Sequence, residues 1–156
     1  MFIKKDLRKV REILNDAEDK REEVRLGRRS GEFGGTLKIL TSASAVAKLS
    51  NLRVLSLYQN GLRDIRSIGA LSRTPLEEIN LGANALTSLP GELSTIKTLK
   101  RIWAEDNRLG EGGVTAYHPV TELQGLLELR LSNNGIKSLH ADVGKLGSLE
   151  VLAIDG

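Results

Sequence analysis

Four stretches of this 156-residue chain follow one pattern: LRVLSLYQNGL at residues 52–62, LEEINLGANAL at 76–86, LKRIWAEDNRL at 99–109 and LLELRLSNNGI at 126–136. A fifth copy, LEVLAIDG, occupies residues 149–156, and successive copies start 24, 23, 27 and 23 residues apart. Each complete copy fits L-x-x-L-x-L-x-x-N-x-L, with isoleucine at some leucine positions and Ala104 as the one undersized residue. Such a period is typical of a repeat architecture, in which each unit buries its apolar face against the next.

Each copy also predicts its own local structure. Alternation at Leu55 and Leu57 is the period-two signature of a short strand with one buried face. An asparagine follows each strand at a fixed offset, where its amide can serve main-chain groups that the turn leaves unpaired; a lost partner in a buried place costs about 1–3 kcal/mol. The members of this predicted asparagine ladder are Asn60, Asn84, Asn107 and Asn134. Apolar residues then recur at three- and four-residue steps, which predicts a helical or 3-10 return on the opposite side.

The copies resemble the leucine-rich-repeat family over residues 52–156. The resemblance implies an α/β solenoid with a curved parallel sheet on its concave face and short helices or 3-10 turns on its convex face. The segment NGLRDIRSIGAL is similar to phosphatase-regulatory members, whereas NALTSLPGELSTIKTL is similar to the intracellular Ras-group-related class. The subfamily therefore stays open.

Residues 1–35 are predicted to form an N-terminal amphipathic helix and a glycine-rich connection. The helix is expected from Ile3 to Leu26, because apolar residues follow alternating four- and three-residue steps. We expect it to pack on the first coil and shield its leucines. A coiled coil with another chain is the alternative, which Arg21 disfavours by interrupting the third heptad. Gly27 and Gly31 are expected to end the helix.

Residues 36–156 are predicted to form the repeat domain. Residues 36–51 are interpreted as a degenerate first coil, with a strand at Thr36–Leu40 and a short helical return at Ala43–Leu49. Complete repeats start at 52, 76, 99 and 126, and a truncated one starts at 149. The last coil would expose leucines and a sheet edge, so we expect a partner or further sequence to cover it.

Composition limits the classes of protein that remain. The chain contains no cysteine, which favours a reducing, intracellular environment. No signal-peptide run or window of about 18 apolar residues occurs, so we expect a cytoplasmic or nuclear protein without membrane contact. The formal net charge is only +3, with 23 basic and 20 acidic residues, and this gives little attraction to nucleic acid.

Strand positions that point away from the leucines are expected to line the concave face and to bind a protein partner. Trp103 is central to this prediction, because it is the only tryptophan and the alternation places it away from the core. Aromatic and arginine side chains are enriched at binding hot spots. The alternative is an indole that covers the small Ala104 or is simply solvated. The candidate binding residues are Tyr58, Glu78, Asn80, Arg101, Trp103, Glu105, Glu128 and Arg130.

The third coil carries an insertion, GEGGVTAYHPVTEL, at residues 110–123. Tyr117 and His118 could contact a partner there, although a tolerated insertion is the simpler interpretation. The only histidines, His118 and His140, lie on different coils, with no cysteine to join them in metal ligation or nucleophilic chemistry. We therefore expect no catalytic residue, no metal and no cofactor.

These observations predict a non-catalytic protein-binding scaffold or adaptor that uses its concave face. The regulatory portion or subunit of an enzyme, in phosphatase or GTPase regulation, is the alternative that the resemblance implies. A ribonucleoprotein component is a third hypothesis, prompted by the pI near 9.3 and the basic first helix. The basic helix lacks interleaved aromatic residues, and this disfavours the ribonucleoprotein hypothesis.

Overall fold

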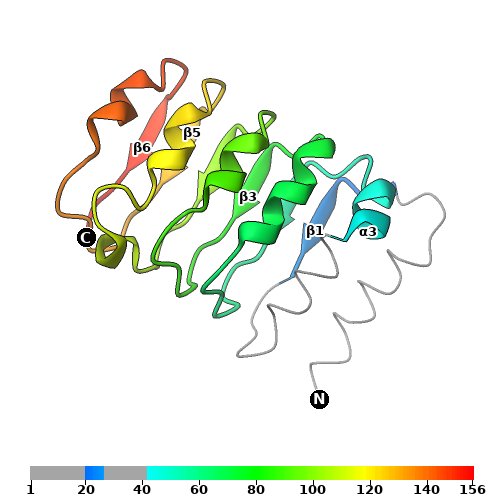
Figure 1. Ribbon diagram of the computed structural model, residues 1–156, viewed down its shortest axis with the longest axis horizontal. Coiled ribbons are helices and arrows are strands. Elements are labelled where there is room, and N and C mark those ends of the chain that lie inside the picture. The colour runs from blue at the N-terminus through cyan, green and yellow to red at the C-terminus, as the bar shows by residue number, and fades with distance from the viewer. Residues whose placement is uncertain (1–19, 27–41) are drawn as a thin grey trace.

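The strands of the chain form one parallel sheet whose strands follow in chain order. The computed structural model describes residues 20–26 and 42–156. Within them the sheet has six strands in the order β1-β2-β3-β4-β5-β6 (Figure 1). Their bounds are β1 Glu23–Arg25, β2 Val54–Ser56, β3 Glu78–Asn80, β4 Arg101–Trp103, β5 Glu128–Arg130 and β6 Val151–Ala153. A parallel sheet in this order requires a return connection between successive strands, which the helical turns supply.

The returns all lie on the same side of the sheet, as Figure 1 shows. They are α3 Ala43–Lys48 and five 3-10 helices: η1 Arg66–Arg73, η2 Gly91–Thr95, η3 Leu109–Gly112, η4 His118–Glu122 and η5 Ala141–Lys145. This arrangement is the predicted leucine-rich-repeat solenoid, and the fold class is confirmed. We call the helical side the turn face and the opposite side the open sheet face.

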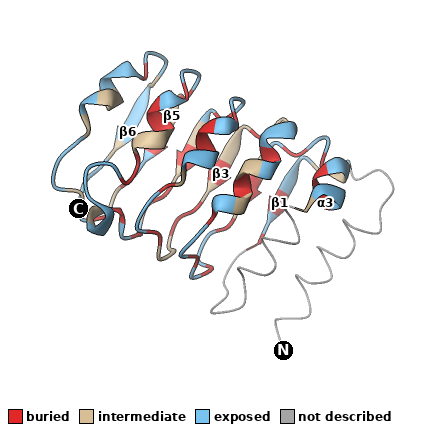
Figure 2. Ribbon diagram, viewed as in Figure 1, coloured by how far each residue is buried: buried red, intermediate tan, exposed pale blue. Residues whose placement is uncertain are grey.

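The core lies between the sheet and the turns, where Figure 2 shows the buried residues. The middle residue of each central strand points into it, and parallel register aligns these residues in one column. Leu55, Ile79, Ile102 and Leu129 are all fully buried. Burying one such side chain stabilises the folded state by about 1.5–3 kcal/mol, so the stacked aliphatic column supplies much of the stability.

The ladder asparagines hydrogen-bond one coil to the next. Oδ1 of Asn84 accepts from the backbone N–H of Asn60 and of Leu62 in the preceding coil, both at 3.0 Å. Its Nδ2 donates to the carbonyls of Leu57 at 3.0 Å and Leu81 at 2.7 Å. One side chain thereby satisfies main-chain groups of two coils, as the fixed offset of these asparagines predicts.

Each ladder asparagine is preceded by a residue in the left-handed region. The φ angles are 56° at Gln59, 53° at Ala83, 55° at Asp106 and 56° at Asn133. Non-glycine residues adopt this conformation rarely. Its recurrence at one position of four coils shows that the same turn aims every ladder amide inward.

The N-terminal part differs from the sequence-based prediction. Residues 23–25 form strand β1 and not the end of a helix, because Glu23 and Arg25 are exposed while Val24 is buried beside Leu55. The rest of the predicted helix, the glycine-rich connection and the predicted strand at residues 36–40 lie outside the described residues. Because β2 pairs with β1 on one edge and with β3 on the other, no edge of β2 is left for the strand that the sequence predicted at residues 36–40.

The insertion of the third coil is part of the core. It forms η3 and η4, and it buries Ala116, Tyr117, Val120 and Leu123. The Tyr117 side chain is 0% exposed, so the expectation that it could contact a partner is wrong. The extra length of this coil is filled with packed side chains.

Candidate functional site on the open sheet face

The outward residues of the six strands form two columns on the open sheet face. Parallel register places Glu23, Val54, Glu78, Arg101, Glu128 and Val151 in the first column. The second contains Arg25, Ser56, Asn80, Trp103, Arg130 and Ala153. Neighbouring strands lie about 4.8 Å apart, so side chains within a column are in reach of one another.

Charged side chains pair across the strands. Arg101 on β4 is bound on both sides: its Nη1 pairs with Glu78 on β3, and its Nε lies 3.6 Å from Oε2 of Glu128 on β5. Arg130 pairs with Glu128 from the second column. The sequence predicted a mixed surface from these residue types, and the register makes it a connected network of alternating charge.

Glu128 is the most buried acid of this network, with 13% of its side chain exposed. Burial alone would raise its pKa, but the Arg130 guanidinium, the Trp103 indole and the charge of Arg101 together lower the pKa below the ordinary value. The pKa of Arg130 is raised, chiefly by hydrogen bonding to Glu128, and the charge of Glu105 adds to this. Both shifts favour the charged forms, so the pair stays ionised at neutral pH.

Trp103 lies on the open sheet face and outside the leucine core. The neighbouring core position is taken by Ile102, which is fully buried, whereas Trp103 is half-buried. Its Nε1 is buried and has no hydrogen-bond partner of ordinary geometry among the described residues, although the indole contributes to the lowered pKa of Glu128. The nitrogen edge is thus turned toward the protein, which leaves carbon atoms of the ring for contact.

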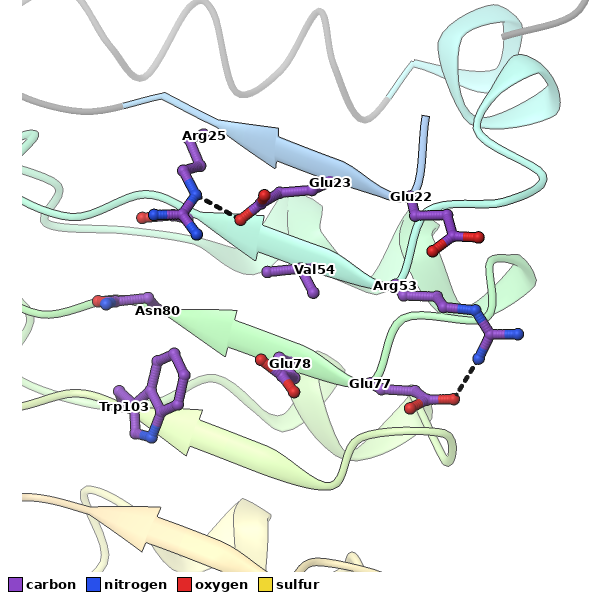
Figure 3. A pocket seen from close by; sticks show the side chains of 10 residues that line it. Glu22, Glu23, Arg25, Arg53, Val54, Glu77, Glu78, Asn80 and Trp103 are labelled. Atoms are coloured by element: carbon purple, nitrogen blue, oxygen red, sulfur yellow. Dashed lines mark hydrogen bonds and ion pairs between the residues drawn. The ribbon is translucent and has the colours of Figure 1, made fainter. Parts of the chain in front are cut away.

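The ring of Trp103 borders an open hollow of about 480 Å³ over β1 to β4. Figure 3 shows the side chains around it, with the indole beside Asn80. The lining residues are Glu22, Glu23, Arg25, Arg53, Val54, Ser56, Glu77, Glu78, Asn80 and Trp103. Four of them are glutamates and two are arginines, and Lys100 and Arg101 of the next coil pair with Glu77 and Glu78, so charges of both signs meet in and beside the hollow.

Three ion pairs lie at the rim of the hollow. Arg53 Nη1 lies 2.6 Å from Glu77 Oε1, and Arg25 pairs with Glu23. Lys100 Nζ approaches the other oxygen of Glu77 at 3.3 Å. These side chains are substantially exposed, so each pair orients its members more than it stabilises the fold.

Tyr58 and Asn80 lie side by side near this hollow. The Tyr58 ring covers Gly82, where an added Cβ would come within 3.1 Å of the ring. Asn80 Oδ1 accepts a hydrogen bond of 2.9 Å from the Gly82 backbone N–H. Glycine at 82 therefore lets the Tyr58 ring pack closely against the turn that follows β3.

The eight predicted binding residues all lie on or beside the open sheet face. The structure joins Glu78, Arg101, Glu128 and Arg130 by ion pairs and sets Trp103 among them. The prediction missed Glu23 and Arg25 on β1, and it missed Glu22, Arg53 and Glu77, which precede strands and complete the hollow. Arg53 and Glu77 follow the first residue of consecutive copies, so their 24-residue spacing was a usable signal.

The turn face holds a second polar cluster, which corrects another expectation. His118 and His140 belong to different coils, yet their ring centroids are 4.6 Å apart. His118 Nε2 lies 3.0 Å from Asp142 Oδ2, and Lys145 Nζ lies 2.8 Å from Asp142 Oδ1. Hydrogen bonds from Lys145 and then His118 lower the pKa of Asp142. The separation expected of the two histidines is wrong.

Comparison with protein-family models gives no match. Over 78 residues the chain is 33% identical to LTRK 1 of Lymnaea stagnalis, which is described as a candidate neurotrophin receptor. The matched region is 50% of this chain and 10% of that protein. The chain thus spans about a tenth of that relative's length.

Solved structures with the same fold are more numerous. The C-terminal domain of Caenorhabditis elegans tropomodulin superposes with a TM-score of 0.63 at 17% identity, over 88% of this chain and 86% of that one. A leucine-rich-repeat protein of Leptospira interrogans gives 0.57 at 20% identity, over 93% and 45%. An internalin of Listeria monocytogenes gives 0.54 at 20% identity, over 72% and 31%. At these identities the likeness establishes the leucine-rich-repeat fold.

Within residues 20–26 and 42–156, no helix has the length and apolar character needed to cross a membrane.

Proposed function

We propose that the chain is a non-catalytic protein-binding module that takes up a partner segment across the open sheet face, in the hollow beside Trp103. The observation that carries the proposal is the half-buried indole at the border of an open hollow lined by charged side chains. Indole rings supply large contact area with little conformational freedom to lose, and tryptophan is enriched at binding hot spots.

The lining of the hollow indicates the chemistry of the partner. Charged side chains of both signs line the hollow, most of them joined in ion pairs, and Trp103 offers the carbon atoms of its ring. A segment that places an apolar side chain against the indole and polar or charged groups against the paired side chains fits both features. Electrostatic complementarity of this kind favours specific association.

One structure with the same fold supports binding of a peptide partner. The plant peptide hormone receptor RGFR1 was solved in complex with RGF2, and it matches this chain at 25% identity with a TM-score of 0.54 over 70% of the chain. This chain spans only 18% of that receptor. A scaffold and a regulatory portion of a phosphatase or GTPase regulator would both use such a face, and enzymatic activity of the captured partner distinguishes them.

The test is capture of partners from native extract on the immobilised chain, with the bound proteins identified by mass spectrometry. Trp103→Ala should weaken retention of the specific partner at least about tenfold, since hot-spot truncations cost about 2 kcal/mol or more. Circular dichroism and the melting curve should stay close to those of the wild type. Retention equal to the wild type would exclude Trp103 as the contact.

A second pair of variants separates binding from folding. Ser56→Arg places bulk and positive charge in the hollow and removes no native ion pair, so it should prevent partner retention. Ser72→Arg is the matched control, because Ser72 is an exposed residue of η1 on the turn face. A partner that is lost with both variants, or with neither, would contradict binding in the hollow.

A further inference from the structure

The two histidines and Asp142 converge on the turn face from successive coils. His118 is the first residue of η4, His140 immediately precedes η5, and Asp142 lies in its first turn. Both imidazoles face one carboxylate oxygen: His118 Nε2 is 3.0 Å and His140 Nδ1 is 3.9 Å from Asp142 Oδ2. One donor atom from each residue can be chosen so that all three lie within 4.8 Å of one another.

We propose that His118, His140 and Asp142 bind a divalent transition-metal ion of the Zn²⁺ type. Around a tetrahedral Zn²⁺ with bonds of about 2.0–2.2 Å, ligand atoms are separated by roughly 3.4 Å. The distances of 3.0 and 3.9 Å lie on either side of that value, so small side-chain adjustments bring the donors to bonding distance. Two imidazoles and a carboxylate suit zinc, whereas Ca²⁺ and Mg²⁺ require oxygen ligands.

The donors are reachable from solvent. The exposed fractions of the side chains are 39% for His118, 25% for His140 and 26% for Asp142. An ion can therefore enter, and water can complete its coordination at the open position that a three-ligand site leaves. The protein contributes three ligands in this arrangement and water supplies the remainder.

The surroundings fix the position of His140. Its backbone N–H donates a 2.8 Å hydrogen bond to the buried Tyr117 hydroxyl, which in turn donates to the Ser138 carbonyl at 3.1 Å. Its Nδ1 accepts from the Asp142 N–H at 3.1 Å, a bond that metal ligation through this atom would replace. Supporting contacts of this kind orient ligands and raise metal affinity.

Lys145, in contrast, is expected to weaken metal binding. Its ammonium lies 2.8 Å from Asp142 Oδ1 and its side chain is 68% exposed. A cation at this distance competes with a metal for the same carboxylate. Removing that charge should therefore tighten metal binding, which gives a variant of opposite sign to the loss of a ligand.

The bound metal would link η4 to η5 and so join two adjacent coils. Because a ligand that binds only the folded state stabilises it, ZnCl₂ at about a hundredfold excess over Kd should raise Tm by roughly 5 °C or more. The site lies on the turn face, away from the hollow beside Trp103, so it stands or falls independently of partner binding.

The experiment is calorimetric titration of ZnCl₂ into the full chain without an affinity tag, together with the visible absorption spectrum of the Co²⁺ form. We expect one Zn²⁺ per chain and no saturable binding of Mg²⁺ or Ca²⁺. His118→Gln, His140→Gln and Asp142→Asn should each weaken Zn²⁺ binding at least about tenfold. Lys145→Gln should tighten it roughly two- to fivefold.

Glu122→Gln is the matched control, since Glu122 is an exposed acid of η4 outside the cluster. It should bind Zn²⁺ as the wild type does. The assignment is overturned if the folded wild type shows no saturable Zn²⁺ binding, or if the three ligand variants bind as tightly as Glu122→Gln. Should a histidine variant unfold, the exposed Lys145→Gln still decides, because unchanged affinity there contradicts ligation by Asp142.

Discussion

The two faces of this solenoid are built from the same coils, but strand register places the residues of one face and the packing of each return places those of the other. On the open sheet face, register aligns residues of successive strands, so Glu78, Arg101 and Glu128 meet in one column. On the turn face, the returns range from the four residues of η3 to the eight of η1. There His118 and His140 meet although the coils that carry them differ in length.

The difference shows where a repeat constrains its residues. A strand residue is held by hydrogen bonds to both neighbouring strands, and a one-residue slip would turn core leucines to solvent. A return has only to bury its apolar side and rejoin the next strand. It can absorb an insertion, as residues 110–123 do by burying Tyr117. The sheet face is therefore regular, while the turn face is free to acquire individual sites.

The largest loss of stability is expected from a substitution in the asparagine ladder, at Asn107. Its Oδ1 accepts from the Leu86 N–H at 3.0 Å, and its Nδ2 donates to the carbonyls of Leu81 at 3.0 Å and Ala104 at 3.1 Å. Asn107→Ala leaves the buried Leu86 N–H without a partner, at about 1–3 kcal/mol. It also removes one of the two ladder amides that donate to each carbonyl, since Asn84 still donates to Leu81 and Asn134 to Ala104. The free energy of unfolding in urea should fall by about 2–4 kcal/mol.

Asn80→Ala is the matched control for this variant. Asn80 is also an asparagine of the repeat, but its side chain accepts one hydrogen bond, from the Gly82 N–H on the open sheet face. We expect it to cost no more than about 1 kcal/mol. Equal losses in the two variants would mean that the ladder position carries no special share of the stability.

A smaller effect is expected at an individual contact of the turn face. Tyr117→Phe keeps the buried ring but removes the hydroxyl that accepts from the His140 N–H and donates to the Ser138 carbonyl. These groups are partly buried, so the loss should be about 1–2 kcal/mol in the same urea titration. Tyr58→Phe, which alters a tyrosine exposed on the other face, should change stability by less than about 0.5 kcal/mol. A loss below that of Tyr58→Phe would show that the insertion does not depend on this contact.

The difference between the two faces also explains which features could be predicted from the sequence. Four copies in register predicted the stacked strands, the ladder amides and the placement of Trp103 outside the core, because all three follow from a fixed offset. Strand β1 was missed because Val24 lies seven residues after Ala17 and so continues the helical series, although Val24 and Leu26 also alternate as in a strand. Without that strand, the hollow over β1 to β4 could not be inferred.

The pairing of the two histidines required the fold itself. They lie 22 residues apart, close to one repeat, but the insertion of the third coil hides that both lie at the start of a return. Only the packing of η4 against η5 shows that a residue before one turn faces the start of the other. Sites on the turn face depend on how each return packs, and periodicity does not encode that.

The smallest change in stability is expected in the charge network of the open sheet face, and this change depends on pH. The folded state holds the pKa of Glu128 below the ordinary value of 4.5, against the opposing effect of burial, through Arg130, Trp103 and Arg101. A carboxyl whose pKa is lower in the folded state contributes stability above its unfolded pKa and loses it as pH falls through the folded value. Glu128→Gln should therefore cost up to about 1 kcal/mol at pH 7, and the difference from wild type should shrink below pH 4.5.

Urea titrations of the wild type and Glu128→Gln at pH 7 and at pH 3 measure this difference directly. Glu111→Gln, which removes an exposed acid from η3, corrects for the change in net charge. High salt should reduce the effect at pH 7, because the guanidinium groups of Arg101 and Arg130 are partly exposed and their attraction is screened. A cost that is the same at both pH values would show that Glu128 stabilises the sheet by packing alone. The alternating charges would then serve to present Trp103 to a partner and would contribute nothing to holding the strands together.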